Sequence, residues 1–243
     1  MISVIIATYN AQSCLQKTID SLKSQTNKDF ELIIVDGKSK DETIDIIKAN
    51  SDIVNKFIYE ADKGIYDAWN KGIKISKGKW ICFIGAGDTL VPEAFEKYNN
   101  LQHNEYDYIS AKINRIDEKG NYLSTMGRPW IWKEFISAML IAHVGSLHSR
   151  KMFNEIGYFD LSYKISADYE LLLRKGDQLK YAFLDFTIGS MPIGGASYSV
   201  ASLKEAAKAK YFTGKVKLLN VVVIFLKQLF LFKTDIIRSK FKN

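Results

Sequence analysis

The sequence predicts an α/β fold in which a central, mostly parallel sheet is flanked by helices, followed by a C-terminal amphipathic helical extension. Two observations predict the sheet. Short apolar runs alternate with segments of helical periodicity over the first 90 residues, and each run ends near a polar or acidic residue. At 243 residues and 47% hydrophobic composition, the chain is also long enough to bury one large core.

Strands and helices are expected to alternate strictly in the first half of the chain. Strands are predicted at residues 2–7, 30–35, 56–60 and within the stretch 79–88, where Asp88 lies just past the strand's carboxyl end; this last strand is the most apolar and therefore central. Helices are predicted at residues 11–25, from a capping box of Ser39 and Glu42 to residue 49, and from the turn at residues 62–64 to residue 75. Because right-handed crossovers bring the loops after parallel strands to one edge, a site is expected there, near Thr8, Asp36, Asp62 and Asp88.

After Asp88 the regular alternation of strand and helix ends. We expect a helix at residues 92–98, an antiparallel hairpin of residues 106–116 and 122–125, a helix at 130–141 and a strand at 142–148. Helices at 150–156 and from 167 to about 176, a strand at 181–190 and a flexible loop at 192–197 complete the prediction.

The stretch GAGD at residues 85–88 combines small residues with a carboxylate. Without bulky side chains, a diphosphate can approach the backbone closely, and Asp88 is a hard oxygen ligand suited to Mg²⁺ or Mn²⁺. The alternative is a helix N-cap aspartate on a glycine-rich turn.

Charge and cysteine content exclude several classes of protein. The net charge is +7, but residues 215–243 carry seven cations and one acid, so the body is close to neutral and a nucleic-acid binder is not expected. Two separated cysteines, Cys14 and Cys82, suit neither a metal site nor a disulfide framework. Because a strand begins at residue 2 with no basic region before it, no signal peptide is expected, and the protein is predicted to be cytoplasmic.

Four segments, in this order, resemble bacterial glycosyltransferases of family 2: SVIIATYN, IIVDGKSKDET, DKGIYDAWNKGIKISKGKWICFIGAGD and AHVGSLHSRKMFNEIGYFDLSYKISADYELLLR. The last is similar to the branch that builds polysaccharide and O-antigen units. The resemblance implies a GT-A (nucleotide-diphospho-sugar transferase) fold over residues 1–200, with a nucleotide-binding half at about 1–100 and an acceptor half at about 101–200. Residues 201–243 would form a helical membrane-interface extension.

The resemblance also implies residue roles. Asp36 would hydrogen-bond the base, uracil above all, with Thr8 and Tyr9 lining the pocket, and Asp62, Lys63 and Gly87 would contact the nucleotide. Asp88 would bind Mg²⁺ or Mn²⁺, and Asp168 would be the catalytic base. Further contacts to donor or acceptor are assigned to Asn70, His143, Gly195 and Ser197. The structural alternatives are packing of Tyr9 over the sheet end, a solvated turn at Asp62 and Lys63, an N-cap role for Asp168 and a hydrogen-bonded core role for His143.

Two positions depart from the family pattern. Gly85 stands where an acid or asparagine is usual, and Gly37 where many relatives have a second aspartate. The implied function is a metal-dependent inverting hexosyl- or N-acetylhexosaminyltransferase that uses a nucleotide-sugar donor. Its acceptor would be a polyprenyl-diphosphate-linked saccharide. A degenerate transferase that binds without turnover and a nucleotidyltransferase are the rival functions, and a homo-oligomer stays open.

The C-terminal segment at residues 215–233 is apolar but interrupted. Its longest uninterrupted apolar run, at residues 221–226, is six residues, whereas a spanning helix needs about 20. As a helix it would carry a narrow polar stripe of Lys217, Asn220, Lys227, Thr234 and Arg238. This pattern predicts a helix lying on an anionic membrane surface, at the inner face of the plasma membrane. The alternative is a helix packed on the body or on a second subunit.

Overall fold

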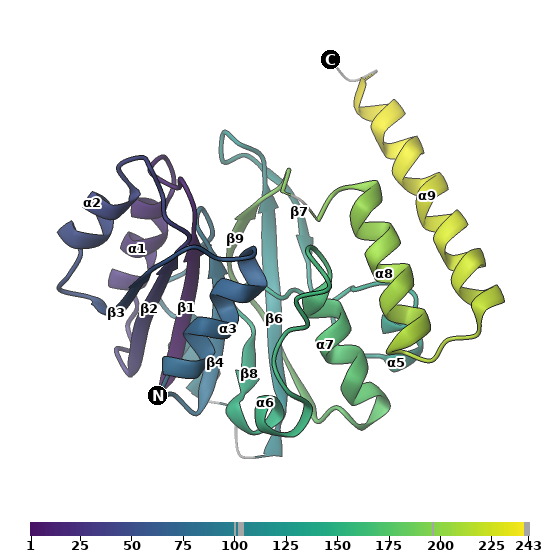
Figure 1. Cartoon of the computed structure of the whole chain (residues 1–243), viewed down its shortest axis with the longest axis horizontal. Helices are drawn as coiled ribbons and strands as arrows, with labels where there is room; N and C mark the ends of the chain where they lie inside the picture. Colours follow the sequence, from purple (N-terminus) through teal and green to yellow (C-terminus); the bar gives the residue numbers. More distant parts are fainter. Residues whose placement is uncertain (100, 102–104, 196, 241–243) are drawn as a thin grey trace.

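The computed structural model describes residues 1–99, 101, 105–195 and 197–240, and for residues 235–240 it describes the backbone alone. The first half alternates as predicted (Figure 1). Its elements are β1 (Ile2–Thr8), α1 (Leu15–Lys23), β2 (Phe30–Asp36), α2 (Thr43–Ala49), β3 (Val54–Tyr59), α3 (Ile65–Ile75) and β4 (Trp80–Gly85).

The first four strands are parallel, with one register shift, between Leu32 and Ile33 in the pairing of β2 with β3. Strand β1 lies between β2 and β4, and β3 is the outer neighbour of β2. Thr8 of β1 stands opposite Asp36 of β2, and Asp36 in turn stands opposite Tyr59 of β3. Gly85, the last residue of β4, is paired with Ala7. The carboxyl ends of these strands therefore form one continuous rim, as the sequence predicted.

The second half makes the sheet mixed. Its elements are β5 (Thr89–Leu90), α4 (Ala94–Asn99), β6 (Tyr108–Ile116), β7 (Tyr122–Met126), α5 (Trp132–Phe135), β8 (Leu147–Ser149), α6 (Arg150–Ile156), α7 (Ala167–Lys175), the 3₁₀ turn η2 (Gly176–Gln178) and β9 (Tyr181–Pro192). The described strands form one sheet in the order β3-β2-β1-β4-β8-β6-β9-β5, with β7 paired to β6. Strand β4 is central as predicted, but its second neighbour β8 is antiparallel to it.

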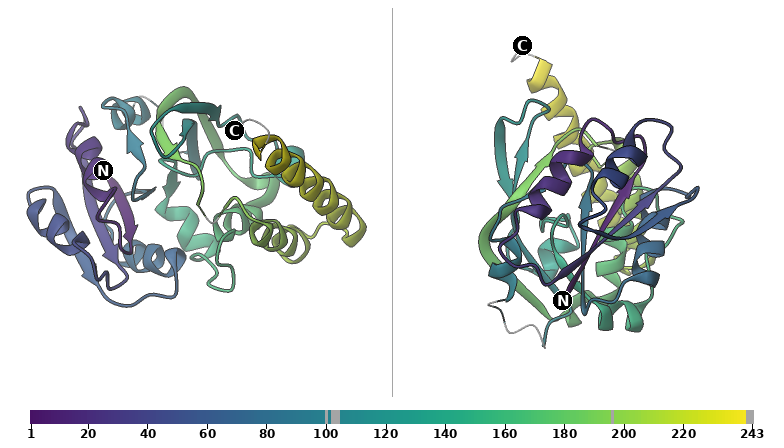
Figure 2. Two further views of the ribbon diagram at one scale, coloured as in Figure 1. Left: turned by 90° about the horizontal axis from the view of Figure 1, so that it is seen from above. Right: turned by 90° about the vertical axis from the view of Figure 1, so that its left-hand side faces the viewer.

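The sheet is covered on both faces (Figure 2). Alternate residues of β1 point to opposite faces, so Ile5 joins a core with α3, α6 and α7, while Val4 and Ile6 join a core with α1 and α4. All three side chains are fully buried. This two-sided burial explains why the parallel strands are continuous apolar runs in the sequence.

The predicted helix at residues 130–141 is wrong for most of its length, because only α5 is helical there. The hydroxyl of Tyr169 lies 2.8 and 2.9 Å from the carbonyl oxygens of Phe135 and Ile136. Those carbonyls would accept bonds from the next turn of a longer helix. A tertiary donor replaces that turn, which local periodicity does not reveal.

The predicted strand at residues 142–148 is also largely wrong. A turn closed by a bond from the Ser146 amide to the His143 carbonyl at 3.0 Å occupies most of it, with Gly145 at φ 72°. The strand is reduced to β8, and His143 lies before it. Pairing of β8 between β4 and β6 requires only a short segment there.

The capping box is the third correction. Helix α2 begins at Thr43 and has no side-chain cap bond, because the Ser39 hydroxyl is used elsewhere, on Asp36. The helix still ends at the predicted residue, Ala49.

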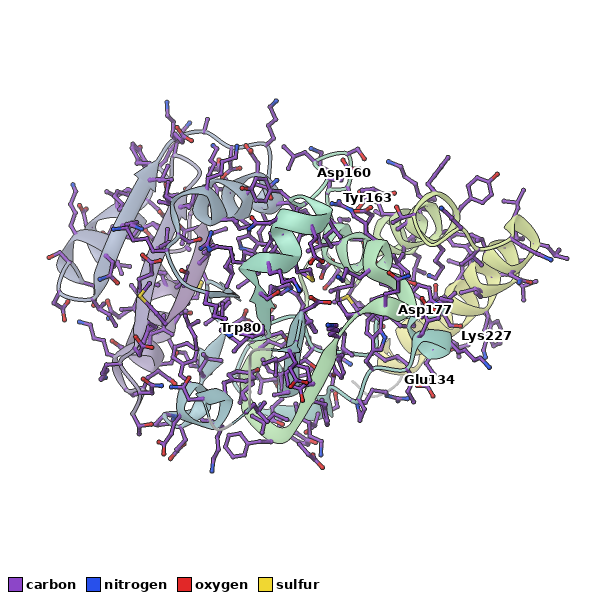
Figure 3. The ribbon with its side chains drawn as sticks, turned by 90° about the horizontal axis from the view of Figure 1, so that it is seen from below. Trp80, Glu134, Asp160, Tyr163, Asp177 and Lys227 are labelled. Carbon is purple, nitrogen blue, oxygen red and sulfur yellow. The ribbon has the colours of Figure 1, made fainter. Side chains whose placement is uncertain are left out.

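The chain ends in two antiparallel helices, α8 (Val200–Phe212) and α9 (Leu218–Lys240), with α9 outermost (Figure 1). Helix α9 packs on α8, and Gln228 donates to the carbonyl of Ser137 at 2.8 Å. Its outer side exposes apolar residues, while Val221 faces inward. Figure 3 shows Lys227 on this helix, far from Trp80 in the sheet. None of the described helices combines the length and the apolar character needed to cross a membrane.

Candidate functional site

A hydrogen-bond network ties the first two strand ends together. Asp36 Oδ2 accepts from the Thr8 hydroxyl at 2.7 Å and from the Ser39 hydroxyl at 2.6 Å, and its Oδ1 accepts from the Ser39 amide at 2.7 Å. Asp36 is fully buried. The carboxylate therefore orders the loops after β1 and β2, and the chain's own donors already occupy it.

Tyr9 stands on the exposed side of this network. Its side chain is 63% exposed, so the alternative of packing over the sheet end is wrong. The next residue, Asn10, has φ 49° and accepts from the Lys40 amide, which locks the loop against the one after β2. The result is a fixed loop that presents an aromatic ring to solvent at the rim.

The loop before α3 approaches the same network. A Cβ added at Gly37 would stand 2.5 Å from Asp62 Oδ2, so the Asp62 carboxylate lies directly against the Gly37 backbone. Asp62 Oδ1 accepts from the Gly64 amide at 2.9 Å. The Lys63 side chain is exposed. This loop is thus an ordered turn beside Asp36 rather than a freely solvated one.

Asp88 folds back on the end of β4. Its Oδ2 accepts from the Gly85 amide at 2.7 Å, and its own amide donates to the Gly85 carbonyl at 3.1 Å. The side chain is 8% exposed. Burial raises the pKa of Asp88 to about 7, against the opposing effect of the Gly85 bond. The Asp88 carboxylate is therefore poised between its neutral and charged forms near physiological pH.

The residues present offer limited support for a metal ion. In the part of the chain that the structure describes, no three His, Cys, Asp or Glu side chains are grouped as a cation site. Asp88 alone supplies an oxygen ligand at this turn. The donor set fits a cation that brings diphosphate and water as its remaining ligands, as Mg²⁺ tolerates, and does not fit a preformed protein site.

Asp168 lies in the first turn of α7, and the N-cap is Ser166, so the N-cap alternative for Asp168 is wrong. Asp168 Oδ1 is 3.0 Å from the Tyr66 hydroxyl of α3 and accepts from the Tyr169 amide at 2.8 Å. Asp168 also acts electrostatically on His143, opposing the fall in the pKa of His143 that burial causes. A carboxylate from the second half of the chain is thus joined to a helix of the first half.

Asn70 and His143 line the interior beneath this contact. Asn70 exchanges two hydrogen bonds with the backbone of Phe159, at 2.9 and 3.1 Å, and so joins α3 to the segment before α7. The His143 ring contacts the rings of both Trp69 and Phe83, and its Nε2 is buried with no hydrogen-bond partner among the described residues. The alternative of a hydrogen-bonded core histidine therefore does not describe Nε2.

The remaining predicted residues lie near the end of β9. The Gly87 amide donates to the Thr18 hydroxyl at 2.8 Å, and a Cβ at Gly87 would stand 3.7 Å from Pro192. The loop that begins at Pro192 thus starts beside the Asp88 turn. Gly195 and Ser197 are exposed, and Ala196 lies outside the described residues.

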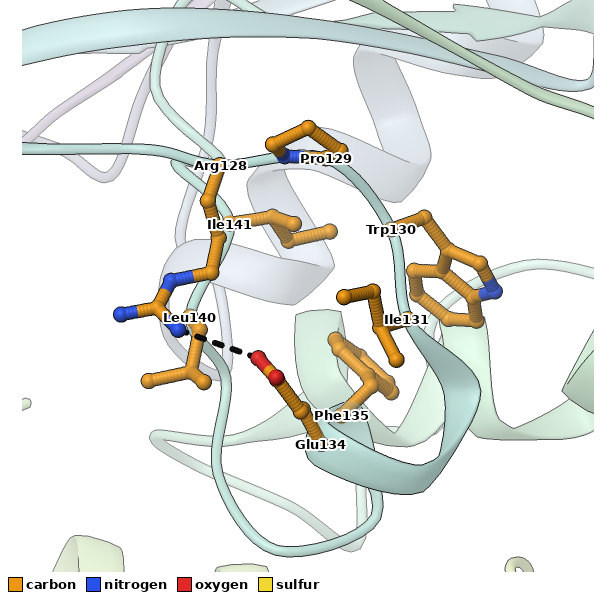
Figure 4. Close-up of a pocket in the computed structure, with 8 residues that line it drawn as sticks. All are labelled: Arg128, Pro129, Trp130, Ile131, Glu134, Phe135, Leu140 and Ile141. Carbon is orange, nitrogen blue, oxygen red and sulfur yellow. Dashed lines mark hydrogen bonds and ion pairs between the residues drawn. The ribbon is translucent and has the colours of Figure 1, made fainter.

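A surface crevice lies elsewhere, around α5 (Figure 4). Apolar side chains line it, and the ion pair of Arg128 and Glu134, 3.0 Å apart, lies at its edge. It contains none of the residues predicted for the site.

Sequence reasoning missed three residues that organise the site. Ser39 binds Asp36, Tyr66 contacts Asp168, and Glu205 of α8 accepts from the amides of residues 164–166 just before α7. Ser39 and Tyr66 stand inside the segments that carry the family resemblance, which was the available signal. Glu205 lies outside them, and its role depends on how α8 packs.

The chain is similar to known glycosyltransferases in sequence. The family model described as "Glycosyl transferase family 2" matches residues 3–161. A PGL/p-HBAD biosynthesis glycosyltransferase of Mycobacterium bovis is 30% identical over 180 residues, which cover 72% of this chain and 69% of that protein. An uncharacterised glycosyltransferase of Methanocaldococcus jannaschii is 27% identical over 229 residues, covering 88% and 78%.

Solved structures agree on the fold. S. aureus TarS in complex with UDP-GlcNAc aligns with a TM-score of 0.70 at 16% identity, over 94% of this chain and 71% of that one. The mannosyltransferase PcManGT of Pyrobaculum calidifontis, in complex with GDP-Man and Mn²⁺, aligns at 0.68 and 13%, over 92% and 69%. The chain thus has a GT-A-like α/β fold, and it belongs to glycosyltransferase family 2.

Proposed function

We propose that the protein is an inverting glycosyltransferase that moves a hexosyl or N-acetylhexosaminyl group from a UDP-linked donor to a hydroxyl of a lipid-linked surface-polysaccharide precursor, such as an O-antigen unit. The observation that carries the proposal is the in-register rim, where the Thr8–Asp36 network, the Asp62 turn and the Asp88 turn end successive parallel strands. The UDP and UDP-GlcNAc bound by TarS support the choice of nucleotide.

The nucleotide would lie along this rim. Asp36 is buried and already accepts hydrogen bonds from Thr8 and Ser39. A direct hydrogen bond from the base to Asp36 would therefore require one of these bonds to break. We therefore assign Asp36 primarily to holding the loops, with Tyr9 stacking on the base. Lys63 is exposed on the neighbouring loop and is available to a phosphate. Gly87, in contrast, is buried with its amide on the Thr18 hydroxyl and would shape the Asp88 turn that meets the diphosphate.

Asp88 would hold Mg²⁺ or Mn²⁺ together with the donor diphosphate; the Mn²⁺ complex of PcManGT supports this choice of cofactor. When bound, the cation would neutralise charge on the departing nucleoside diphosphate. The Asp168 carboxylate would take the proton of the acceptor hydroxyl as that oxygen attacks the anomeric carbon. A single displacement inverts that centre and needs no second carboxylate as nucleophile. His143 and the loop of Gly195 and Ser197 would contact the sugars, whereas Asn70 holds the segment before α7.

The acceptor and the membrane belong to the same proposal. We propose that residues 1–200 form the transferase domain and residues 201–243 an extension that docks on the inner, anionic face of the plasma membrane. On α9, Leu219, Leu226 and Phe230 share one exposed face. Lys227 and Lys233 flank that face, as in helices that lie on anionic lipid. A polyprenyl-diphosphate-linked saccharide would be presented at that surface.

The proposal is tested by incubating the protein with a panel of UDP- and GDP-sugars and Mg²⁺ or Mn²⁺, and by measuring release of the nucleoside diphosphate. Turnover of one donor, abolished by Asp88→Ala, supports the transferase and fixes the donor. Asp168→Asn should retain UDP binding by calorimetry and lose transfer once an acceptor is supplied.

The rival functions give other outcomes. UDP binding without turnover, even with membranes carrying lipid-linked saccharide, would indicate a degenerate transferase. Release of pyrophosphate from a nucleoside triphosphate would indicate a nucleotidyltransferase.

A further inference from the structure

The contact between Tyr66 and Asp168 crosses from the nucleotide half to the acceptor half. Tyr66 is one residue into α3, directly after the Asp62–Gly64 turn, and is 5% exposed. Its hydroxyl oxygen is 3.0 Å from Asp168 Oδ1 and 2.6 Å from the carbonyl oxygen of Ile165. Two acceptors therefore lie within reach of one buried hydroxyl.

A tyrosine hydroxyl has a single proton, so it can donate to only one of these oxygens at a time. Burial, reinforced by the neighbouring Asp168 charge, raises the pKa of Tyr66, so the hydroxyl keeps its proton at physiological pH. An ionised carboxylate is the stronger acceptor, because charge-assisted hydrogen bonds are about twice as strong as neutral ones. Once that carboxyl is neutral, the peptide carbonyl of Ile165 becomes the competitive acceptor.

The surroundings hold the two acceptors in fixed places. Glu205 Oε2 accepts from the amides of Lys164, Ile165 and Ser166 at 2.8 to 3.0 Å, which fixes the peptide that carries the Ile165 carbonyl. Asp168 Oδ1 is also held by the Tyr169 amide. No described residue donates to Asp168 Oδ2, which leaves that oxygen for a substrate.

Resting on the function proposed above, we propose that Tyr66 is the positioning residue of Asp168 and acts as a hydrogen-bond switch. It donates to Asp168 Oδ1 while the carboxylate is charged. When Asp168 takes the proton of the acceptor hydroxyl on Oδ2, the Tyr66 hydroxyl turns to the Ile165 carbonyl. Tyr66 loses no proton in the cycle, and the only proton transferred is the one that passes from acceptor to Asp168.

The switch has three consequences. It stabilises the charged base before reaction, and it leaves no buried hydroxyl unpaired afterwards. It also links the base to the Asp62 turn at the start of α3, so the position of the base depends on the loop assigned to the donor.

The test observes Asp168 directly, without turnover. We would label aspartate side-chain carboxyls with ¹³C, assign Asp168 by the signal lost in Asp168→Asn, and follow its chemical shift against pH. Tyr66→Phe should raise the Asp168 titration midpoint by about one pH unit, because the bond to the charged form is lost. Tyr169→Phe is the matched control: Tyr169 is also buried with its hydroxyl on two carbonyls, but that hydroxyl points away from Asp168.

The ¹³C signal of the Ile165 carbonyl provides the second readout. It should follow the Asp168 titration in the wild type and lose that step in Tyr66→Phe. Among the described residues, His143 and Tyr108 also interact electrostatically with Asp168. The His143 ring signals, recorded in the same samples, separate its titration from that of Asp168.

An unchanged midpoint in Tyr66→Phe, or an equal shift in Tyr169→Phe, would overturn the switch. If Tyr66→Phe does not fold, 3-fluorotyrosine at position 66 makes the hydroxyl a stronger donor and should lower the midpoint; no change there also overturns the switch. Because neither readout needs a sugar donor, the two proposals can fail separately. A shifted midpoint in a protein that releases no nucleoside diphosphate from any donor of the panel, even with membranes carrying lipid-linked saccharide, would reject the proposed function and keep the switch.

Discussion

The carboxylate of Asp62 lies where a side chain at position 37 would begin. An added Cβ on Gly37 would stand 2.5 Å from Oδ2 and 3.2 Å from Cγ of Asp62. Many relatives are expected to carry an aspartate at position 37, and here that place is filled by a carboxylate from another loop. Gly37 therefore makes room for the Asp62 carboxylate, so a carboxylate is still present at this place.

Gly37→Ala should displace Asp62 without unfolding the protein. Asp62 is partly exposed and can rotate, so we expect the free energy of unfolding to fall by less than about 1 kcal/mol. The rotation breaks its bond to the Gly64 amide and disorders the donor loop, and UDP affinity should fall by up to about tenfold. Calorimetric titration with UDP measures the affinity. The Gly37→Ala substitution is also made in an Asp62→Ala background. If Gly37→Ala weakens UDP equally in that background, the two residues are not coupled.

Gly85→Asp should create a firmer cation site. The substitution adds a second carboxylate beside Asp88, and cation affinity rises with the number of charged ligands. We expect Mn²⁺ affinity without nucleotide to increase by about tenfold, measured at pH 7.5 from the electron paramagnetic resonance signal of free Mn²⁺. Gly85→Ala introduces the same Cβ, 2.9 Å from Asp88 Oδ2, without a ligand. Equal gains in both variants would show that displacement of Asp88 alone is responsible.

Lys210 gives the stability a pH dependence of known sign. This lysine of α8 is 1% exposed, with its ammonium over the Tyr169 ring, and burial lowers its pKa to about 8 from an ordinary 10.5. Between these values the unfolded chain binds more protons, so this contribution to stability rises with pH from about 8 to 10.5.

Lys210→Met keeps the apolar stem and removes the charge. At pH 7 the variant should be more stable than the wild type by about 3 kcal/mol, and the gap should narrow as the pH rises from about 8 to 10.5. Urea unfolding of both proteins measures the difference, which cancels the titration of tyrosines and cysteines common to both. A gap that does not change with pH would mean that the buried ammonium is not its source.

The outer face of α9 should bind anionic vesicles. Phe230→Asp places a charge in the exposed apolar face, and we expect at least about a tenfold loss of binding to vesicles that contain phosphatidylglycerol. Lys227→Gln with Lys233→Gln should weaken binding and remove most of its salt dependence. Leu123→Asp on β7 changes an exposed leucine far along the chain and serves as the control. If vesicles bind none of these proteins and the oligomeric state changes in Phe230→Asp, a second copy of the chain covers this face.

Prediction from sequence succeeded where local patterns suffice. The strand ends at Thr8, Asp36 and Gly85 follow from apolar runs closed by polar or small residues, and parallel pairing puts them on one rim. Helix α6 ends at Gly157 as predicted, where a positive φ of 80° suits glycine. The capping box failed because the Ser39 hydroxyl binds Asp36. The prediction for residues 130–148 failed because tyrosine hydroxyls from α7 and β6 bind carbonyls of this segment.

The sequence by itself determined the α/β class, the order of the rim loops and the family, because periodicity and short motifs are local properties of the chain. Only the tertiary structure decided that Asp36 is occupied by Thr8 and Ser39, that Asp62 fills the space over Gly37, and that Tyr66 reaches Asp168. Apart from the local bond between Asp36 and Ser39, each of these contacts joins residues that are far apart along the chain. Their geometry depends on how helices and loops pack on the sheet, and no spacing along the chain encodes that packing.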